Sequence, residues 1–193
     1  MLSGLKIVTF GFLIPFLVSC GDYSISDVIE NPRVLVDPTV NMKTDSAFHA
    51  YIHSFEKYHK NSVKLPIIFD DENAIENPDH AAVCIKNFAP VKSRYIVVRR
   101  ENWDKLDAHG AESLIFHELG HCVLDLDHED DLEWVDLNER IRAKYPVSFM
   151  SSRHWLGERP NRASLIERMF DINIDEESPE YREELNDLNK IEK

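Results

Sequence analysis

The sequence is poor in basic residues and has no long apolar run. It contains 22 Lys and Arg against 35 Asp and Glu, which gives a formal net charge of −13. A surface this acidic repels phosphate backbones, so we expect no nucleic-acid partner. The main apolar run, residues 7–18, is shorter than the roughly 20 residues that a helix needs to cross a bilayer. Its length suits the hydrophobic region of an export signal better.

The residues around this run also favour export. Lys6 gives a thin positive region before it, and residues 17–20 are Leu-Val-Ser-Cys, which matches the lipobox of bacterial lipoproteins. We therefore predict a signal peptide over residues 1–19 and lipid attachment at Cys20. Two or three acyl chains, at about 0.8 kcal/mol per buried CH₂, would hold the protein firmly at a membrane. The expected location is the bacterial cell envelope, facing the periplasm or the exterior; a plain signal peptide cleaved nearby, or a short membrane anchor, is the alternative.

Cysteine is scarce, with three residues in the chain. If Cys20 carries lipid, Cys84 and Cys122 are left in an oxidising compartment, where a disulfide between them is possible. Two buried free thiols are the alternative, because spacing along the chain does not show proximity in space. The sequence leaves both open.

The chemistry of the chain is concentrated in an H-E-x-x-H motif formed by His117, Glu118 and His121. On a helix, residues four apart lie on the same side, so both histidines can bind one ion at about 2.0–2.1 Å. Glu118 is rotated by about 100° from His117 and can stand beside the ion without binding it. That is the position of the general base in a zinc hydrolase.

The segment around the motif predicts an amphipathic helix. Its apolar stripe consists of Ile115, Leu119, Cys122 and Leu126. A stripe with this period packs on a sheet or on other helices and leaves the histidines on its flank. We therefore expect a helix with one apolar face.

A catalytic zinc site needs a third protein ligand. His128 is too far along the chain to share the helical face of His117, so the chain must turn after Leu124. Asp125 suits this turn because Asp tolerates the left-handed conformation better than most residues. We predict His128 as the third ligand, since imidazole is common at catalytic zinc, with Asp127 as the alternative.

These residues resemble the metzincin zinc peptidases, whose pattern is H-E-x-x-H-x-x-G-x-x-H followed by a turn that contains methionine. Residues 145–152 are Tyr-Pro-Val-Ser-Phe-Met-Ser-Ser, and Met150 would be the methionine of that turn. The chain departs from the pattern at Leu124, where the family has Gly, and its last His comes one residue late. It is also similar to a group of small bacterial metallopeptidases that carry H-E-L-G-H-C.

The rest of the chain predicts a mixture of helices and strands. Apolar spacing indicates a helix over residues 45–58, with His49 and His53 facing solvent because they lack an adjacent Glu and an obvious third ligand. Short β-branched and apolar runs predict strands, and further segments predict helices. The strands are expected at 65–69, 82–86 and 95–99, a helix or an excursion over the site at 130–144, a short helix at 165–170, and a charged, solvated helix at 179–193.

We expect an α/β (α+β) fold. The resemblance implies a twisted mixed sheet, an N-terminal helix, a zinc-binding helix, and a small helical part after the Met-turn. The predicted parts are the signal peptide (1–19), a tether (20–43), a zinc metallopeptidase domain (44–172) and a charged helical tail (173–193). The sequence contains no repeats, and we expect a monomer.

The resemblance implies a zinc-dependent peptidase, in which Glu118 takes a proton from a zinc-activated water during attack on a peptide bond. A peptide or protein substrate would align antiparallel to the edge strand of the sheet, for which residues 82–86 are a candidate. Tyr145 or His154 could donate to the oxyanion. The alternatives are a thermolysin-like site with Glu139 as the third ligand, and a lipoprotein that holds zinc to bind a partner without catalysis.

Overall fold

The computed structural model describes residues 42–71, 75–87, 93–138, 141–152 and 160–191. The predicted signal peptide, Cys20 and almost all of the predicted tether lie outside these residues, as do Glu139 and His154. Among the helices of the described residues, none has the length and apolar character to cross a membrane.

The first helix of the domain matches its prediction. A 3-10 turn, η2 (Ser46–Phe48), leads into α2 (His49–His59). The Asp45 side chain begins it by accepting a hydrogen bond from the Ala47 backbone N–H at 3.0 Å, as an N-cap residue does. The buried side consists of Phe48, Tyr51 and Phe55, and the exposed side includes His49 and His53, as expected.

Three strands form a mixed sheet in the order β1-β3-β2. They are β1 (Ile67–Phe69), β2 (Ala82–Asn87) and β3 (Ser93–Val98). The strand β3 pairs in parallel with β1 and antiparallel with β2. The three predicted strands are confirmed, with ends that differ by one or two residues. The strand β2, which contains the candidate edge residues 82–86, is at one edge of the sheet, and β1 is at the other.

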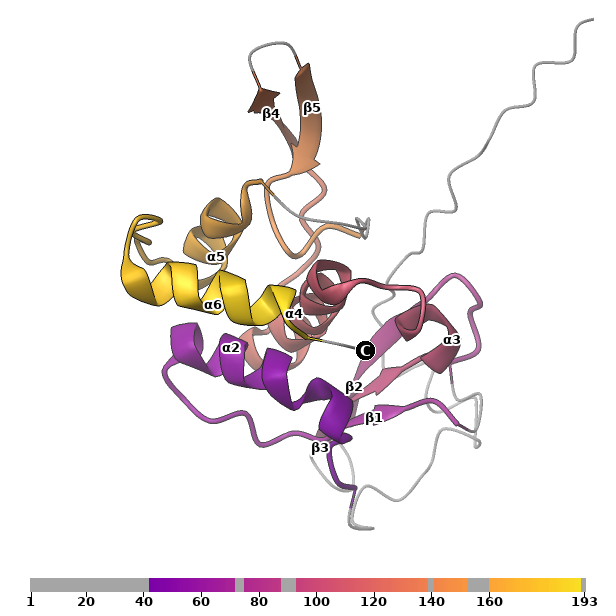
Figure 1. Ribbon diagram of the computed structural model, residues 1–193. Coiled ribbons are helices and arrows are strands. Elements are labelled where there is room, and N and C mark those ends of the chain that lie inside the picture. The colour runs from indigo at the N-terminus through magenta and orange to yellow at the C-terminus, as the bar shows by residue number, and fades with distance from the viewer. Residues whose placement is uncertain (1–41, 72–74, 88–92, 139–140, 153–159, 192–193) are drawn as a thin grey trace, which may run out of the picture.

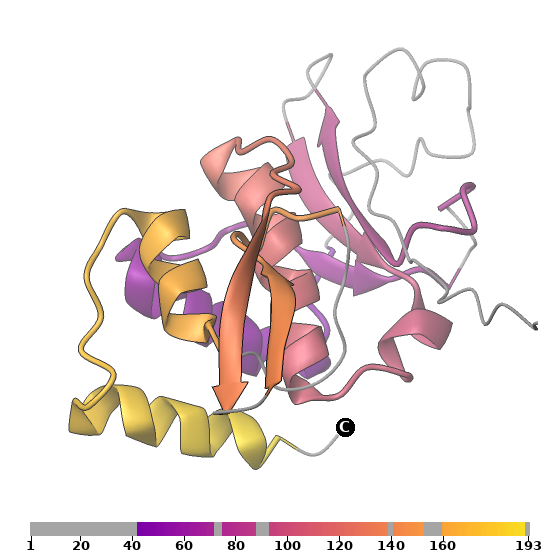
Figure 2. The same cartoon turned by 90° about the horizontal axis from the view of Figure 1, so that it is seen from above.

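The two faces of the sheet bury different clusters, because successive side chains of a strand point to opposite sides. Ala82 and Cys84 join the main core with the helices. Val83 and Ile85 pack with Tyr95 and neighbouring residues in a smaller cluster. The helices α2, α4, α5 and α6 accordingly lie to one side of the sheet (Figures 1 and 2).

A short helix, α3 (Arg100–Trp103), precedes the long central helix α4 (Ala108–Leu124). The Asp107 side chain caps the start of α4 by accepting from the Gly110 backbone N–H at 2.7 Å. Residues 110–122 of the helix are all buried. The expectation of one apolar face was therefore too narrow, because the C-terminal segments cover the side of α4 that faces away from the sheet. Leu126 lies beyond the end of the helix.

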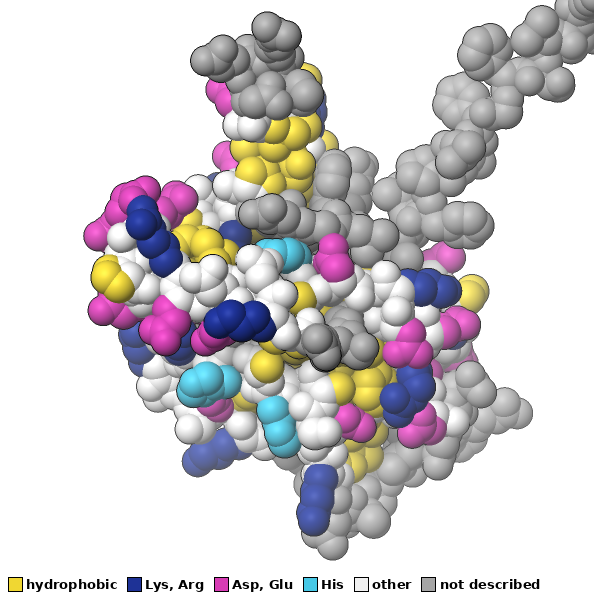
Figure 3. Space-filling model, in the orientation of Figure 1, with side chains coloured by type: hydrophobic (Ala, Val, Ile, Leu, Met, Phe, Trp, Pro, Cys, Tyr) yellow, Lys and Arg dark blue, Asp and Glu magenta, His cyan; other side chains and the backbone are white. Residues whose placement is uncertain are grey.

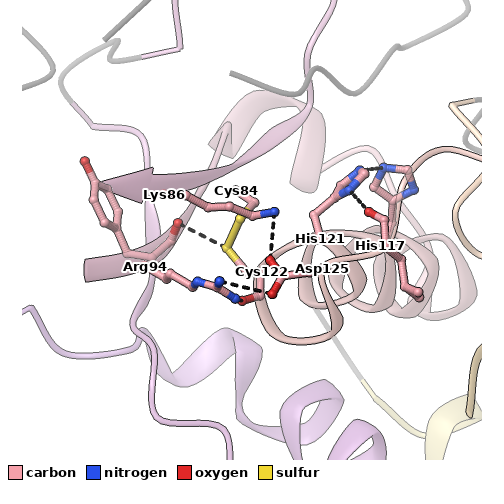
Figure 4. Close-up of a disulfide and its surroundings, with 9 residues drawn as sticks. Cys84, Lys86, Arg94, His117, His121, Cys122 and Asp125 are labelled. Atoms are coloured by element: carbon pink, nitrogen blue, oxygen red, sulfur yellow. Dashed lines mark hydrogen bonds and ion pairs between the residues drawn. A yellow bond between two sulfur atoms is a disulfide. The ribbon is translucent and has the colours of Figure 1, made fainter. Parts of the chain in front are cut away.

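A disulfide joins Cys84 in β2 to Cys122 in α4 (Figure 4). Of the two possibilities that the sequence leaves open, the structure contains the disulfide. Its Cα atoms are 5.6 Å apart, an ordinary separation for a disulfide. The bond ties the edge strand to the last turn of the helix that carries the histidines.

Residues 130–144 do not form a helix, which was one of the two alternatives predicted for them. They belong to an antiparallel hairpin of β4 (Leu132–Asn138) and β5 (Ile141–Pro146), which extends away from the body of the domain (Figure 1). Cross-strand pairs stabilise such a hairpin: Asp136 pairs with Arg142 at 2.6 Å, and Lys144 lies over the Trp134 ring. Trp134 is nevertheless 58% exposed, and hydrophobic side chains are visible on the hairpin in Figure 3.

The chain ends in two helices, α5 (Arg162–Phe170) and α6 (Pro179–Asn189). The first confirms the helix predicted at residues 165–170. The second is helical as predicted, but the expectation of a solvated helix is wrong for its inner side, where Tyr181, Glu184 and Leu188 are buried. An ion-paired cluster of Glu112 from α4, Arg162 from α5 and Glu184 from α6 holds the three helices together.

Candidate metal centre

Three histidine side chains meet at one point. The Nε2 atoms of His117 and His121 are 3.0 Å apart, and that of His128 lies 3.2 Å from His121 and 3.3 Å from His117. In a tetrahedral zinc site with bonds of about 2.0–2.1 Å, ligand atoms are separated by about 3.3–3.4 Å. The triangle is therefore close to the size that one such ion needs. Within the described part of the chain, this is the one group of three or more candidate ligands.

Hydrogen bonds to carbonyl groups fix the protons of the two helical histidines. The Nδ1 atom of His117 lies 2.8 Å from the Phe149 carbonyl oxygen, and that of His121 lies 2.7 Å from the Leu126 carbonyl oxygen. A carbonyl oxygen can only accept, so each Nδ1 carries a proton, and when the ring is neutral its Nε2 lone pair is directed at the other rings. Converging lone pairs repel one another, and a cation between them removes this repulsion.

The donor set fits a divalent metal that prefers imidazole. Three imidazole ligands are typical of catalytic zinc sites, and hydrogen bonds from the second ring nitrogen, present here for His117 and His121, orient such ligands. Copper, nickel and iron also bind imidazole, so the ligands admit zinc without excluding these ions. The three histidines therefore lie close enough together to bind one metal ion.

The end of α4 explains how His128 reaches the other two. Asp125 adopts a left-handed conformation, with φ at 53°, as predicted. The chain then reverses, and the Leu126 backbone N–H donates to the Gly120 carbonyl oxygen at 3.1 Å. Arg94 from β3 binds this end of the helix at the Cys122 carbonyl oxygen and at the Asp125 carboxylate (Figure 4).

The three histidines and their neighbours differ in how far their side chains are exposed to solvent. His117 is 0% and His121 is 1% exposed, whereas His128 is partly exposed and Asp127 is exposed. The side of the cluster next to His128 is therefore the side nearest to solvent. Asp127 is not a member of the metal-binding group, so the arrangement favours His128 as the third ligand.

Glu118 is 0% exposed and directly follows the first histidine. Carboxylates are rarely buried this completely, because the charged form loses its hydration. Sites that move protons are one of the places where proteins retain them. His117 and Glu118 are consecutive residues of α4, and both are 0% exposed.

Residues 147–152, which we name the Met150 turn, pack against α4. Met150 is 2% exposed, and its backbone N–H donates to the Ser148 hydroxyl at 3.0 Å. A Cβ atom added to Gly120 would come within 2.7 Å of the Met169 methyl carbon and still closer to the Met150 sulfur. The Met150 side chain therefore lies against the backbone of α4 between the two helical histidines.

This packing predicts that Gly120→Ala will destabilise the metal-free protein by about 1–3 kcal/mol, since the new methyl group overpacks the contact. Gly110→Ala in the same helix is the matched control, because its Cβ would meet its nearest neighbours at 3.2 Å or more, whereas that of Gly120 would come within 2.7 Å of one. Urea unfolding of both variants measures the difference. Equal effects on the free energy of unfolding would contradict the close approach of Met150.

The loop after α4 is joined to the Met150 turn by Asp130. Its Oδ1 atom accepts from the Ser152 backbone N–H and hydroxyl, both at 2.7 Å, and from the Ser151 hydroxyl at 3.3 Å. Partial burial raises the pKa of the Asp130 carboxyl, but these hydrogen bonds bring it below its ordinary value. No sequence motif marks Asp130. Tyr145, a predicted oxyanion donor, lies on β5 and is partly exposed.

A scan against protein-family models finds no match for this chain, and comparisons with curated proteins and with solved structures find none either. The function is therefore argued from the geometry of the site and from the sequence pattern.

Proposed function

We propose that this protein is a zinc-dependent peptidase of the metzincin type. The observation that carries the proposal is the triangle of Nε2 atoms from His117, His121 and His128, with sides of 3.0–3.3 Å, beside the buried carboxylate of Glu118. An H-E-x-x-H helix, a third histidine after a chain reversal, and a methionine packed against the helix support the metzincin class.

In this proposal the three histidines hold the metal, and Glu118 moves the proton. A bound zinc ion would polarise the carbonyl group of a peptide and acidify the attacking water. Glu118 takes the proton of that water and passes it to the nitrogen of the leaving amine. The Phe149 and Leu126 carbonyl groups keep His117 and His121 in the tautomer that binds metal.

The substrate we propose is an extended peptide or protein segment. The strand β2 is at the edge of the three-stranded sheet, and the disulfide to Cys122 holds it next to α4. A peptide that aligned antiparallel to β2 would gain backbone hydrogen bonds close to the histidines. The lipobox at Cys20 supports substrates that occur in the cell envelope.

The test is to incubate the purified protein with a diverse peptide library and to map the cuts by mass spectrometry. Cleavage is expected with one zinc ion per chain, should be lost after treatment with a chelator, and should return when zinc is added. If the zinc-loaded protein cleaves no peptide, the proposal is wrong and a zinc-binding module without catalysis takes its place. Cleavage that persists in the metal-free protein would also contradict it.

A further inference from the structure

The third histidine differs from the other two in its support. His117 and His121 are held by the helix α4, whereas His128 lies on a loop after the helix ends at Leu124. A loop residue is positioned only by the contacts of its own segment. The contacts of Leu126 fix the segment before His128, and the contacts of residues 129–131 fix the segment after it.

The Glu129 side chain pairs with Arg168 of α5, whereas the backbone contacts of this segment and the Asp130 side chain lead to the Met150 turn. The Glu129 backbone N–H donates to the Met150 carbonyl oxygen at 2.9 Å, and the Asp131 carbonyl oxygen accepts from the Val147 backbone N–H at 3.1 Å. Between these two bonds, the Asp130 carboxylate accepts three hydrogen bonds from Ser151 and Ser152. Hydrogen bonds to an ionised carboxylate are stronger than those between neutral groups.

The same turn also holds the first histidine, because His117 donates to the Phe149 carbonyl oxygen. The Met150 turn thus contacts both segments that must meet at the metal. The hairpin of β4 and β5 lies between Asp130 and the turn in the sequence, so these bonds close a long excursion of the chain. Without these hydrogen bonds, the conformational entropy of the hairpin segment would oppose a fixed position of His128.

We infer that Asp130 is a positioning residue of the metal centre, which sets His128 against His117 and His121 by binding the Met150 turn. Its carboxylate acts through the third ligand and need not touch the metal. The inference depends on the metal-binding part of the proposed function and is independent of peptide cleavage.

The experiment measures zinc affinity of the full-length protein by competition with a chelating dye. Asp130→Ala is expected to weaken zinc binding by about 10–100-fold, the usual effect of removing a group that orients a metal ligand. Asp130→Asn keeps an oxygen that can accept from the Ser152 backbone, so its loss should stay below about tenfold. Asp131→Asn removes the same charge from the next residue and should change the affinity by less than about twofold.

A second readout separates positioning from general stability. In the Co²⁺-loaded protein, Asp130→Ala should change the position and intensity of the visible absorption bands, which depend on ligand geometry, while Asp131→Asn should leave them unchanged. If Asp130→Ala does not fold, Ser152→Ala removes only the hydroxyl donor and should still weaken zinc binding, by roughly threefold or more. Urea unfolding of the metal-free proteins identifies a variant that has lost its fold.

Wild-type zinc affinity in Asp130→Ala would overturn the inference, as would an equal loss in Asp131→Asn, because the charge alone would then explain the effect. Peptide cleavage does not enter either readout. If the protein binds one zinc ion but cleaves no peptide, the peptidase proposal is wrong. The role of Asp130 is then still tested by the zinc affinities of its variants.

Discussion

Replacing Glu118 by Gln is expected to lower kcat/KM for peptide cleavage by about 10²–10⁴-fold, the usual contribution of a general base. The amide has nearly the same shape as the carboxylate but cannot take the proton of the attacking water. The three histidines are unchanged, so Glu118→Gln should still bind one zinc ion per chain.

The measurement pairs steady-state kinetics on one cleaved peptide with the zinc content of each preparation. Asp127→Asn is the control, because Asp127 is exposed next to His128 and lies outside the metal-binding group. It should retain both zinc and activity, and a loss of zinc in this variant would favour Asp127 as the third ligand. Wild-type kcat/KM in zinc-loaded Glu118→Gln would refute the hydrolytic mechanism.

Replacing Arg162 by Met is expected to lower the free energy of unfolding at pH 7 by about 3–5 kcal/mol, the range found when one partner of a buried ion pair is removed. Arg162 and Glu112 are each 2% exposed, and Glu184 is 8% exposed. The guanidinium binds the Glu112 carboxylate with two hydrogen bonds of 2.8 and 2.6 Å and also binds Glu184. Its loss leaves the buried Glu112 carboxylate without this cation and leaves Glu184 paired with Lys57, whose side chain is 45% exposed.

The pH dependence of stability follows from Glu184. Burial raises the pKa of its carboxyl, but Arg162, Tyr58 and Ser54 bring the pKa below its ordinary value in the folded protein. The stabilisation is therefore present above the pKa of the unfolded chain, about 4.3, and is lost as the pH falls through the lower folded value. In Arg162→Met, burial dominates and favours the protonated carboxyl, so the deficit relative to the wild type should shrink as the pH falls from 7 toward 4.

Arg168 provides a matched control in the same helix. It pairs with Glu129, but its side chain is 52% exposed, and an exposed pair contributes about 0–1 kcal/mol. Arg168→Met should therefore lower the free energy of unfolding by no more than about 1 kcal/mol in urea titrations. If Arg162→Met and Arg168→Met lowered the free energy of unfolding by similar amounts, burial of the Glu112, Arg162 and Glu184 cluster would not explain its contribution to stability.

The metal centre could be predicted from the sequence because its determinants are local. The spacing of His117 and His121 is fixed by one turn of helix, and Asp125 marks the residue at which the helix reverses. His128 follows within a few residues, so little of the long-range fold is needed to bring it close. The three strands could be predicted for a similar reason, since each is a short run of β-branched or apolar residues.

The supporting contacts could not be predicted in this way. The carbonyl groups that bind His117 and His121 belong to the backbone of Phe149 and Leu126, and a backbone group leaves no signal in the residue type. Glu112, Arg162 and Glu184 lie on three separate helices, so only the tertiary fold brings them together. The hairpin of β4 and β5 was not predicted, because a pattern of apolar residues among charged ones also suits a helix. Cross-strand pairs stabilise the hairpin, and they form only once the two strands lie side by side.

The disulfide has a consequence for how the protein acquires its metal. Cys122 directly follows His121, and Cys84 is bonded to it. In the reduced chain these are two thiols, and thiolate sulfur is a strong ligand for zinc that competes with imidazole. Oxidation withdraws both sulfurs from that competition and leaves the imidazole nitrogens as the ligands. We therefore expect refolding of the purified protein to give correct metal binding more efficiently when the disulfide forms before the metal is added.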